Sequence, residues 1–264
     1  MRSVIGTGIS RHSYNEVVLA RLENFGDLGA ISWALVRSLG GLELHSAGSE
    51  FHGEGVTAQR PRFLVSGWAA RVRWLSDGRR QILSFLMPGD AIGLDRRATP
   101  MNSAMTIALT DVRSLDATPL SRALHSPDQC WSDLREAMAT AAAVNEAYLL
   151  DQIVRLGRQT AYERLCHTLL ELRHRLETVG LATENSLALP LTQEMLADAT
   201  GLSIVHVNRV LQQLRREKML ELRGGRLNLL NRQQMEKVAD FRTPQPRAWR
   251  GSGAVVRGGS DAAA

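Results

Sequence analysis

Residues 192–214 constrain the fold of this chain more than any other segment. They read TQEMLADATGLSIVHVNRVLQQL, which predicts a short helix, a tight turn and a second helix. Gly201 falls where the turn needs a positive φ, and Ala197 is small where the two helices approach each other closely. Ser203 is placed to cap the second helix, and Val207 begins its apolar face. These residue types at these spacings predict a DNA-binding helix-turn-helix, with an ordinary helical hairpin as the alternative.

The excess of positive charge lies in the same part of the chain as this motif. Residues 1–150 hold 15 Arg and 15 Asp or Glu, whereas residues 151–264 hold 17 Arg or Lys and 12 Asp or Glu, a net of +5. A basic segment attracts phosphates whatever the base sequence. The charge therefore favours double-stranded DNA as a partner, although an excess of this size also fits a solvated surface.

Length, hydropathy and cysteine usage exclude several classes of protein. With 264 residues, 44% of them apolar, the chain suits one large or two modest domains with an apolar core. No run of about 18 apolar residues is present, and the first eleven residues lack the apolar stretch of a secretory signal. Cys130 and Cys166 are too few for a disulfide framework and predict reduced thiols, with a redox-sensing role as the alternative. These features predict a cytoplasmic protein that has no membrane partner.

The first half of the chain changes from a helical to a strand-like pattern. Apolar residues recur at helical spacing over 14–39, with breaks near Gly26 and Gly29. Short alternating segments separated by glycine turns follow over 42–113. This pattern predicts a small antiparallel β barrel or roll.

One predicted strand of this roll alternates clearly. Ala70, Val72 and Trp74 are separated by Arg71 and Arg73, which predicts one apolar face and one polar face. An Asp-Gly pair then predicts a turn into a returning strand, which a Pro-Gly-Asp sequence ends.

A long helical segment follows the predicted roll. Residues 128–156 contain neither Gly nor Pro and are rich in Ala, Leu, Met and Glu, which favour helices. A helix of this length is typical of one that packs against a partner. We predict a two-fold dimerisation helix over 128–157, with a helix lying across its own domain as the alternative. The heptad phase is ambiguous, so the contacting residues are left open.

The remaining segments complete a winged domain. Gly157 separates the long helix from a second helix that Gly180 ends. Beyond the helix-turn-helix, residues 219–222 and 226–230 predict a hairpin, or wing, and 233–241 a closing helix. The tail beyond is rich in Gly, Ala, Ser, Pro and Arg and is predicted to be disordered.

Several strings in this order resemble the Crp/Fnr family of bacterial transcription regulators, over about residues 16–241. They are VSGWA at 65–69, DGRRQI at 77–82, PGDAIG at 88–93 and the segment 191–216. The resemblance implies an α+β fold with an N-terminal antiparallel β roll, the cyclic-nucleotide-binding-like jelly roll, then a long dimerisation helix and a C-terminal winged helix-turn-helix. It also implies a homodimer that binds a pseudo-palindromic promoter site and contacts RNA polymerase.

The resemblance also sets the expected domain bounds. They are a cyclic-nucleotide-binding-like sensor β roll at 14–127, a dimerisation helix at 128–157, a winged helix-turn-helix domain at 158–241 and a disordered tail at 242–264.

The chain departs from the family at the positions that hold a cyclic nucleotide. Nucleotide-binding members carry a Gly-Glu pair, whose Glu takes a ribose hydroxyl, and an Arg-Ser pair, whose Arg neutralises the phosphate. Here these pairs are Gly93-Leu94 and Asn102-Ser103. Leucine accepts no hydrogen bond and asparagine carries no charge, so a buried phosphate would lack its ion pair. We therefore predict no control by cyclic AMP or GMP, and interpret Arg96 and Arg97 as loop charges rather than substitutes.

No metal and no cofactor are expected. The oxygen-sensing branch of the family needs four cysteine ligands for an iron–sulfur cluster, and this chain has two. The seven histidines show no i, i+4 pair on a helix and no metal-ligand context, which favours ordinary surface or capping roles. They are His12, His45, His52, His125, His167, His174 and His206.

The base-reading positions of the family fall on four residues of the second helix: Ile204, Val205, Asn208 and Arg209. Arg209 can pair with guanine O6 and N7, which discriminates bases by roughly 1–3 kcal/mol, and Asn208 can read adenine N6 and N7. The other two residues can contact only thymine methyl groups.

Other polar residues of the domain are placed for backbone phosphates. Near the two helix starts and in the wing, the candidates are Thr192, Gln193, Ser203, His206, Arg223 and Arg226. A solvated surface position is the alternative for each arginine, most of all for the pair in the wing.

The function that these patterns predict is sequence-specific transcription regulation by a protein that is not an enzyme. The alternative is a small-molecule-binding or metal-dependent enzyme built on the β roll. Residues 60–115 contain neither His nor Glu, which argues against a metal enzyme of the cupin type, and no phosphate loop or nucleophile elbow is present. A third alternative is an interaction module that has lost DNA binding, against which Arg209 and the intact motif spacing argue.

Overall fold

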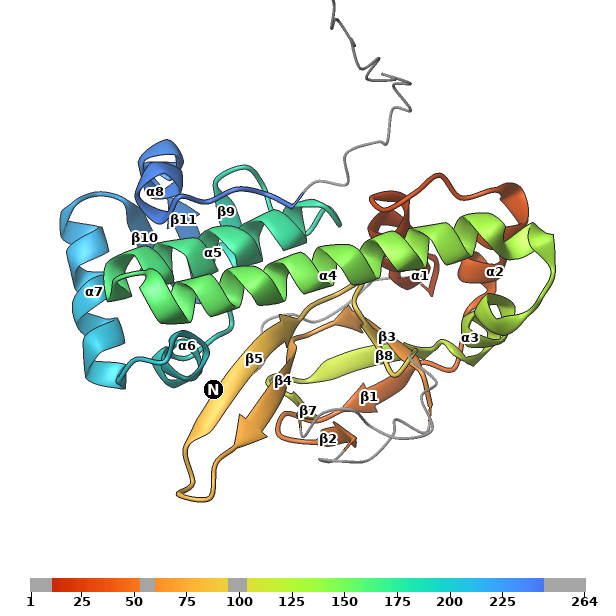
Figure 1. Ribbon diagram of the computed structural model, residues 1–264, viewed down its shortest axis with the longest axis horizontal. Helices are drawn as coiled ribbons and strands as arrows, with labels where there is room; N and C mark the ends of the chain where they lie inside the picture. Colours follow the sequence, from red (N-terminus) through yellow and green to blue (C-terminus); the bar gives the residue numbers. More distant parts are fainter. Residues whose placement is uncertain (1–10, 53–59, 95–103, 245–264) are drawn as a thin grey trace, which may run out of the picture.

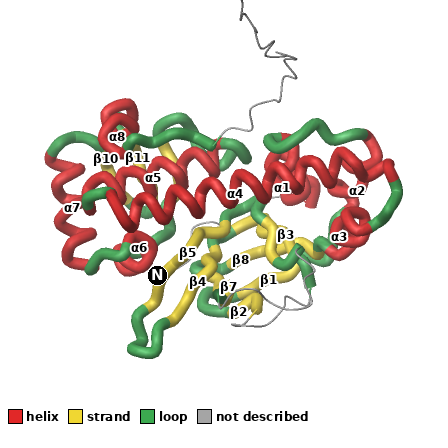
Figure 2. Tube along the Cα trace, in the orientation of Figure 1, coloured by secondary structure: helices red, strands yellow, loops and turns green. Residues whose placement is uncertain are grey.

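The computed structural model describes residues 11–52, 60–94 and 104–244. Its longest element, α4 (Ser132–Arg158), runs the length of the molecule in Figure 1. The β strands of the first half lie along one side of α4, α1–α3 surround one of its ends, and α6–α8 gather at the other. Figure 2 shows this separation of helices and strands. The fold is therefore α+β, as predicted.

The N-terminal β roll consists of two antiparallel four-stranded sheets, with strand orders β1-β8-β3-β6 and β2-β7-β4-β5. Its core includes small and branched side chains that pack between the sheets, among them Leu64, Ala69 and Val112. The strands are β1 (Glu43–His45), β2 (Glu50–His52), β3 (Arg62–Ser66), β4 (Ala69–Trp74), β5 (Arg80–Leu86), β6 (Ala91–Ile92), β7 (Met105–Ala108) and β8 (Val112–Asp116).

The β4–β5 hairpin follows the predicted alternation only in part. Ala70 and Val72 are fully buried, as expected, whereas Trp74 is 45% exposed near the turn. The register shifts between Arg71 and Val72. Arg71, predicted on a polar face, lines an interior cavity because α4 and the loop before β6 cover that side of the sheet. The chain turns at Gly78, which has a φ of 84°.

Three helices cover the roll near the start of α4. They are α1 (Arg11–Glu23), α2 (Ala30–Ser38) and α3 (Thr118–His125). The break at residues 24–29 lies where the sequence predicted it. No sequence pattern indicated α3, a helix of eight residues that buries Leu120.

The long helix differs slightly from its predicted bounds. A short 3-10 turn, η1 (Gln129–Trp131), precedes α4. Gly157 does not end the helix but lies in its last turn, because the chain stays helical as far as Arg158. The next helix, α5 (Ala161–Glu177), begins with a capping box in which Thr160 and Glu163 satisfy each other's backbone N–H groups.

The C-terminal domain is a winged helix-turn-helix. The wing hairpin turns at Gly224 and Gly225, which both have a positive φ, and its second strand pairs with a short strand that the sequence did not predict. The residues of the predicted tail from 245 onward lie outside the described part. The elements are β9 (Ser186–Ala188), α6 (Gln193–Thr200), α7 (Ile204–Arg216), β10 (Leu220–Arg223), β11 (Arg226–Leu229) and α8 (Arg232–Ala239).

Candidate nucleic-acid interface

The helix-turn-helix is built as the sequence predicted. The Thr192 hydroxyl accepts from the backbone N–H of Met195 at 3.1 Å and caps α6. Gly201 has a φ of 65° and ends that helix. The Ser203 hydroxyl accepts from the N–H of His206 at 3.2 Å and caps α7. Both helices therefore begin at a side-chain cap, and a tight turn at Gly201 connects them.

One face of α7 is fixed in the core of the domain. Val207 and Leu214 are fully buried, and Val210 is 4% exposed. On α6, Leu196 and Ala197 are buried in the same apolar cluster. The predicted close approach at Ala197 is confirmed by this packing, which leaves the opposite face of α7 to solvent.

The exposed face of α7 carries the predicted base-reading positions. Val205 is 70% exposed and Ile204 is 49% exposed, which is high for branched apolar side chains. Arg209 is also exposed, one helical turn further along. Within the described ranges, no hydrogen bond or ion pair ties the Arg209 guanidinium to another residue, so it is available to a partner.

Asn208 is held differently from its neighbours. Its side-chain Nδ2 donates to Gln193 Oε1 at 3.0 Å, and its Oδ1 accepts from Gln212 Nε2 at 2.8 Å. The structure thus joins Asn208 to Gln193, which the sequence placed near a phosphate. Gln212 was missed from the sequence, although its i, i+4 spacing from Asn208 is a detectable signal.

The two wing arginines are exposed but have partners on their own domain. Arg223 Nε lies 2.8 Å from Glu221 Oε1, and Arg226 Nη1 donates to Ser186 Oγ at 3.2 Å. Surface pairs of this kind contribute about 0–1 kcal/mol, so they can exchange for phosphates at little cost.

The β4–β5 hairpin contacts α6 through an ion pair. Arg80 donates from Nε and Nη2 to the same Asp198 oxygen, Oδ2, at 2.8 Å and 2.5 Å. Gln152 of α4 donates to the carbonyl of Ala199 at 2.7 Å. The first helix of the motif is therefore fixed both to the N-terminal roll and to the long helix, which no local sequence pattern indicated.

The residues around the expected nucleotide-binding positions are placed only in part. Leu94 is half-buried and packs against the apolar cluster that α1, α2 and β3 share. Asn102, Ser103, Arg96 and Arg97 lie outside the described residues.

The two thiols have raised pKa values. Burial, with the nearby Glu217 and Glu163 carboxylates, raises the pKa of the Cys166 thiol to about 12. The pKa of Cys130 is also raised, by burial first and by Asp128. Both thiols are therefore protonated at neutral pH, which disfavours attack on oxidants.

No group of three or more His, Cys, Asp or Glu side chains that could hold a metal ion occurs among the described residues. Within the same ranges, no helix is both long and apolar enough to cross a bilayer.

The sequence is similar to a known DNA-binding domain and to known transcription regulators. Residues 163–238 match the Crp-like helix-turn-helix domain. The chain is 30% identical over 197 residues to the nitrogen fixation regulation protein FixK of Azorhizobium caulinodans, covering 74% of this chain and 77% of that protein. It is 28% identical over 176 residues to the transcriptional activatory protein AadR of Rhodopseudomonas palustris, covering 67% and 72%.

A solved structure shows the same architecture. FixK2 from Bradyrhizobium japonicum superposes with a TM-score of 0.64 at 30% identity, over 75% of this chain and 96% of that one. TTHB099, a transcriptional regulator from Thermus thermophilus, gives a TM-score of 0.59 at 21% identity, over 76% and 98%. The second likeness concerns the fold alone.

Proposed function

The chain belongs to the Crp/Fnr family of DNA-binding transcription regulators, and we propose that it binds a pseudo-palindromic promoter site as a homodimer, without cyclic AMP. The observation that carries this proposal is the exposed face of α7. Ile204, Val205 and Arg209 project from a helix whose start is capped and whose other face is buried. A helix supported in this way can enter the major groove without rearranging its domain.

Each exposed position on α7 suits one kind of base contact. The free Arg209 guanidinium matches the two acceptors of guanine, and the apolar Ile204 and Val205 match thymine methyl groups. Asn208 reads adenine only after it exchanges its bonds to Gln193 and Gln212. Thr192, Ser203 and His206 lie at the two helix starts, where backbone phosphates approach a helix-turn-helix.

The homodimer is supported by a second exposed stripe, on α4. Ala139, Ala143, Glu146, Leu150 and Ile153 are all exposed and follow one another at steps of four and three residues. Leu150 is 56% exposed and Ile153 is 66% exposed. Small residues at one end and branched ones at the other form a heptad seam for a second copy of α4. This pattern favours the dimerisation role over a helix that serves only its own domain.

Independence from cyclic AMP is supported by Leu94, whose apolar side chain packs against the cluster that α1, α2 and β3 share. A ribose hydroxyl at that position would have no acceptor. We further propose a cytoplasmic location and contact with RNA polymerase. The DNA partner supports the location, and the family resemblance implies the polymerase contact.

The test is to select bound sequences from a random DNA pool and then measure affinity by fluorescence anisotropy. Arg209→Ala should reduce the preference for the selected site over random DNA by roughly tenfold to a hundredfold, since it removes the bidentate guanine contact. Its dimer mass should stay unchanged. Adding cyclic AMP should leave the wild-type affinity the same.

Arg215→Ala is the matched control, because Arg215 is exposed in the last turn of the same helix, away from the capped end. It should weaken binding to selected and random DNA by the same factor. If Arg209→Ala keeps the full wild-type preference, the assignment of α7 as the base-reading helix is wrong.

A further inference from the structure

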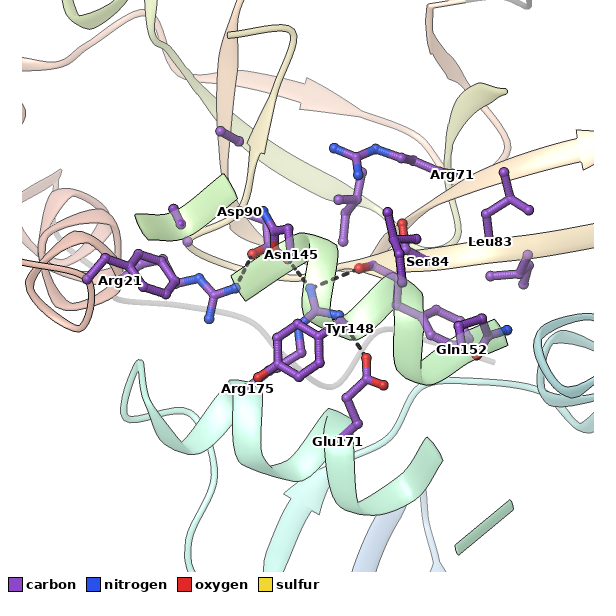
Figure 3. Close-up of a pocket in the computed structure, with 18 of the residues that line it drawn as sticks. Arg21, Arg71, Leu83, Ser84, Asp90, Asn145, Tyr148, Gln152, Glu171 and Arg175 are labelled. Carbon is purple, nitrogen blue, oxygen red and sulfur yellow. Dashed lines mark hydrogen bonds and ion pairs between the residues drawn. The ribbon is translucent and has the colours of Figure 1, made fainter. Parts of the chain in front are cut away.

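A cavity of about 80 Å³ lies between β5, α4, α5 and the loop before β6. Figure 3 shows Arg71 and Ser84 projecting from its sheet side, with Tyr148 and Gln152 on the facing helix. The space has room for several waters, since one water needs roughly 10–15 Å³. It is too small for a nucleotide but large enough for a small ion with a few heavy atoms.

A chain of buried ion pairs forms one wall of this cavity. Asp90 Oδ1 lies 2.8 Å from Arg21, and its Oδ2 lies 2.7 Å from Arg175. Glu171 bridges Arg175 at 3.3 Å and Arg155 at 2.5 Å. None of these five side chains is more than 8% exposed. Asp90 and Glu171 thus each pair with two guanidinium groups.

The cavity has more cations than anions. Among the residues that the structure describes, its lining includes four arginines, namely Arg21, Arg71, Arg155 and Arg175, and two carboxylates. Arg71 is the arginine without a partner: in the described ranges no hydrogen bond or ion pair of its guanidinium is found. Burial lowers the pKa of Arg71, Asp90 opposes this effect, and Arg175 adds to it. A desolvated cation that has no carboxylate in direct contact is costly, so an anion that contacts Arg71 would be stabilised.

Ser84 supplies a second free donor. It is the cross-strand partner of Arg71, so the two side chains lie on the same face of the sheet. The buried Ser84 hydroxyl has no hydrogen-bond partner in the part of the chain that the structure describes. Buried hydroxyl groups are normally satisfied. A ligand that accepts from both Arg71 and Ser84 would satisfy this pair.

We propose that this cavity binds a small oxyanion, either phosphate or the carboxylate of a short organic acid, through the Arg71 guanidinium and the Ser84 hydroxyl. The site lies on β4 and β5, whereas the family's nucleotide-binding positions fall on Gly93-Leu94 and Asn102-Ser103. The proposal does not depend on DNA binding.

The test titrates the full-length protein, without DNA, with inorganic phosphate and separately with acetate and propionate. Chloride keeps the ionic strength constant, and binding is measured by calorimetry and by the shift in Tm. The wild type should show saturable binding of at least one class. Arg71→Met should weaken it roughly tenfold or more, and Ser84→Ala should weaken it less, since the hydrogen bond from the cation is the stronger.

Arg73→Met is the control, because Arg73 lies two residues along the same strand and is exposed. It should bind like the wild type. Saturation by phosphate alone identifies phosphate as the ligand class, and saturation by the organic anions alone identifies a carboxylate. Absence of saturation with all three anions, or equal affinity in the wild type and Arg71→Met, would overturn the proposal. Either result leaves the DNA-binding proposal standing.

Discussion

At the scale of single residues, the buried His167 makes the stability of the fold depend on pH. It lies on α5 with its ring edge against Phe241, the two centroids 5.1 Å apart. Its Nε2 has no hydrogen-bond partner among the described residues. Burial, with a smaller effect of Arg155, lowers the pKa of His167 to about 4, from an ordinary 6.5. Between pH 6.5 and about 4, the His167 ring is therefore mostly neutral in the folded protein but mostly protonated in the unfolded chain.

We predict a dependence of stability on pH from this residue. Between pH 6.5 and about 4 the unfolded state binds the extra proton, so the His167 contribution is complete above 6.5 and is lost as the pH falls. In His167→Leu, the decline of the unfolding free energy over this range should be shallower by up to about 1.4 kcal/mol per pH unit. Urea unfolding at several pH values in this range measures the unfolding free energy of both proteins. If that free energy falls with pH at the same slope in both, the prediction is wrong.

At the scale of elements, α4 presents two different faces. One face is buried against Phe25, which belongs to the N-terminal half of the same chain. This face consists of Ala137, Ala141, Val144 and Tyr148. The stripe defined by Ala139, Ala143, Glu146, Leu150 and Ile153 faces away from that core. A helix with one apolar face buried and another exposed is expected to find a second partner.

The prediction for this stripe is that Ile153→Glu converts the proposed dimer to a monomer. Two Ile153 side chains would lose about 3–6 kcal/mol of apolar burial together, and the added carboxylates would repel each other. Sedimentation equilibrium measures the mass. Leu44→Glu is the control, since Leu44 on β1 is 67% exposed against 66% for Ile153. A monomeric control, or a dimeric Ile153→Glu protein, would refute the seam.

Elements with strong local signals were predictable from the sequence. The cap at Ser203, the turn at Gly201 and the Gly224-Gly225 wing follow from rules that act over a few residues. The cap at Thr192 follows from the same rules, but Thr192 was predicted only as a phosphate contact. The three-residue strand β9 was missed because so short a segment has no periodicity of its own, and it is a strand only through its pairing with β11. α4 continues past Gly157 because a single Gly costs a helix only about 1 kcal/mol.

Contacts between distant residues could not be predicted in the same way. Arg21 and Asp90 are 69 residues apart in the chain, and Asp90 and Arg175 are 85 residues apart. Nothing in the local pattern around Arg71 distinguishes it from the solvated Arg73. Only the packing of α4 and the loop before β6 over the sheet places Arg71 in the cavity. The residues proposed to read bases could be named from the sequence, whereas the proposed oxyanion site could not.

At the scale of the whole molecule, the buried ion pairs join the two halves of the chain. Asp90 of the roll contacts Arg21 of α1 and Arg175 of α5, and Arg175 also donates to the carbonyl of Phe85 at 3.0 Å. Burial alone would raise the pKa of Asp90, but Arg21 and Arg175 hold it below its ordinary value of 3.8. The Asp90 contribution to stability is therefore present above that value and is lost as the pH falls below it.

Asp90→Asn should destabilise the protein strongly. It removes the carboxylate that pairs with the buried Arg21 and leaves Arg175 with Glu171, which Arg175 shares with Arg155. Breaking a buried pair costs about 3–5 kcal/mol. Thermal and urea unfolding at neutral pH measure this loss. Asp77→Asn is the control, because Asp77 is 51% exposed and pairs with Arg79 at the hairpin turn. The control should lose less than about 1 kcal/mol. A loss of similar size in both variants would mean that the ion pairs do not join the two halves.

The contact between Arg80 and Asp198 has a consequence for protein engineering. A chimera that grafts the DNA-binding half of this chain onto the β roll of a relative would separate the two partners. Asp198 would then face whatever residue the foreign hairpin supplies, and α6 would lose its support on that side. Such a graft would have to import Arg80, and the hairpin that carries it, along with α6 and α7.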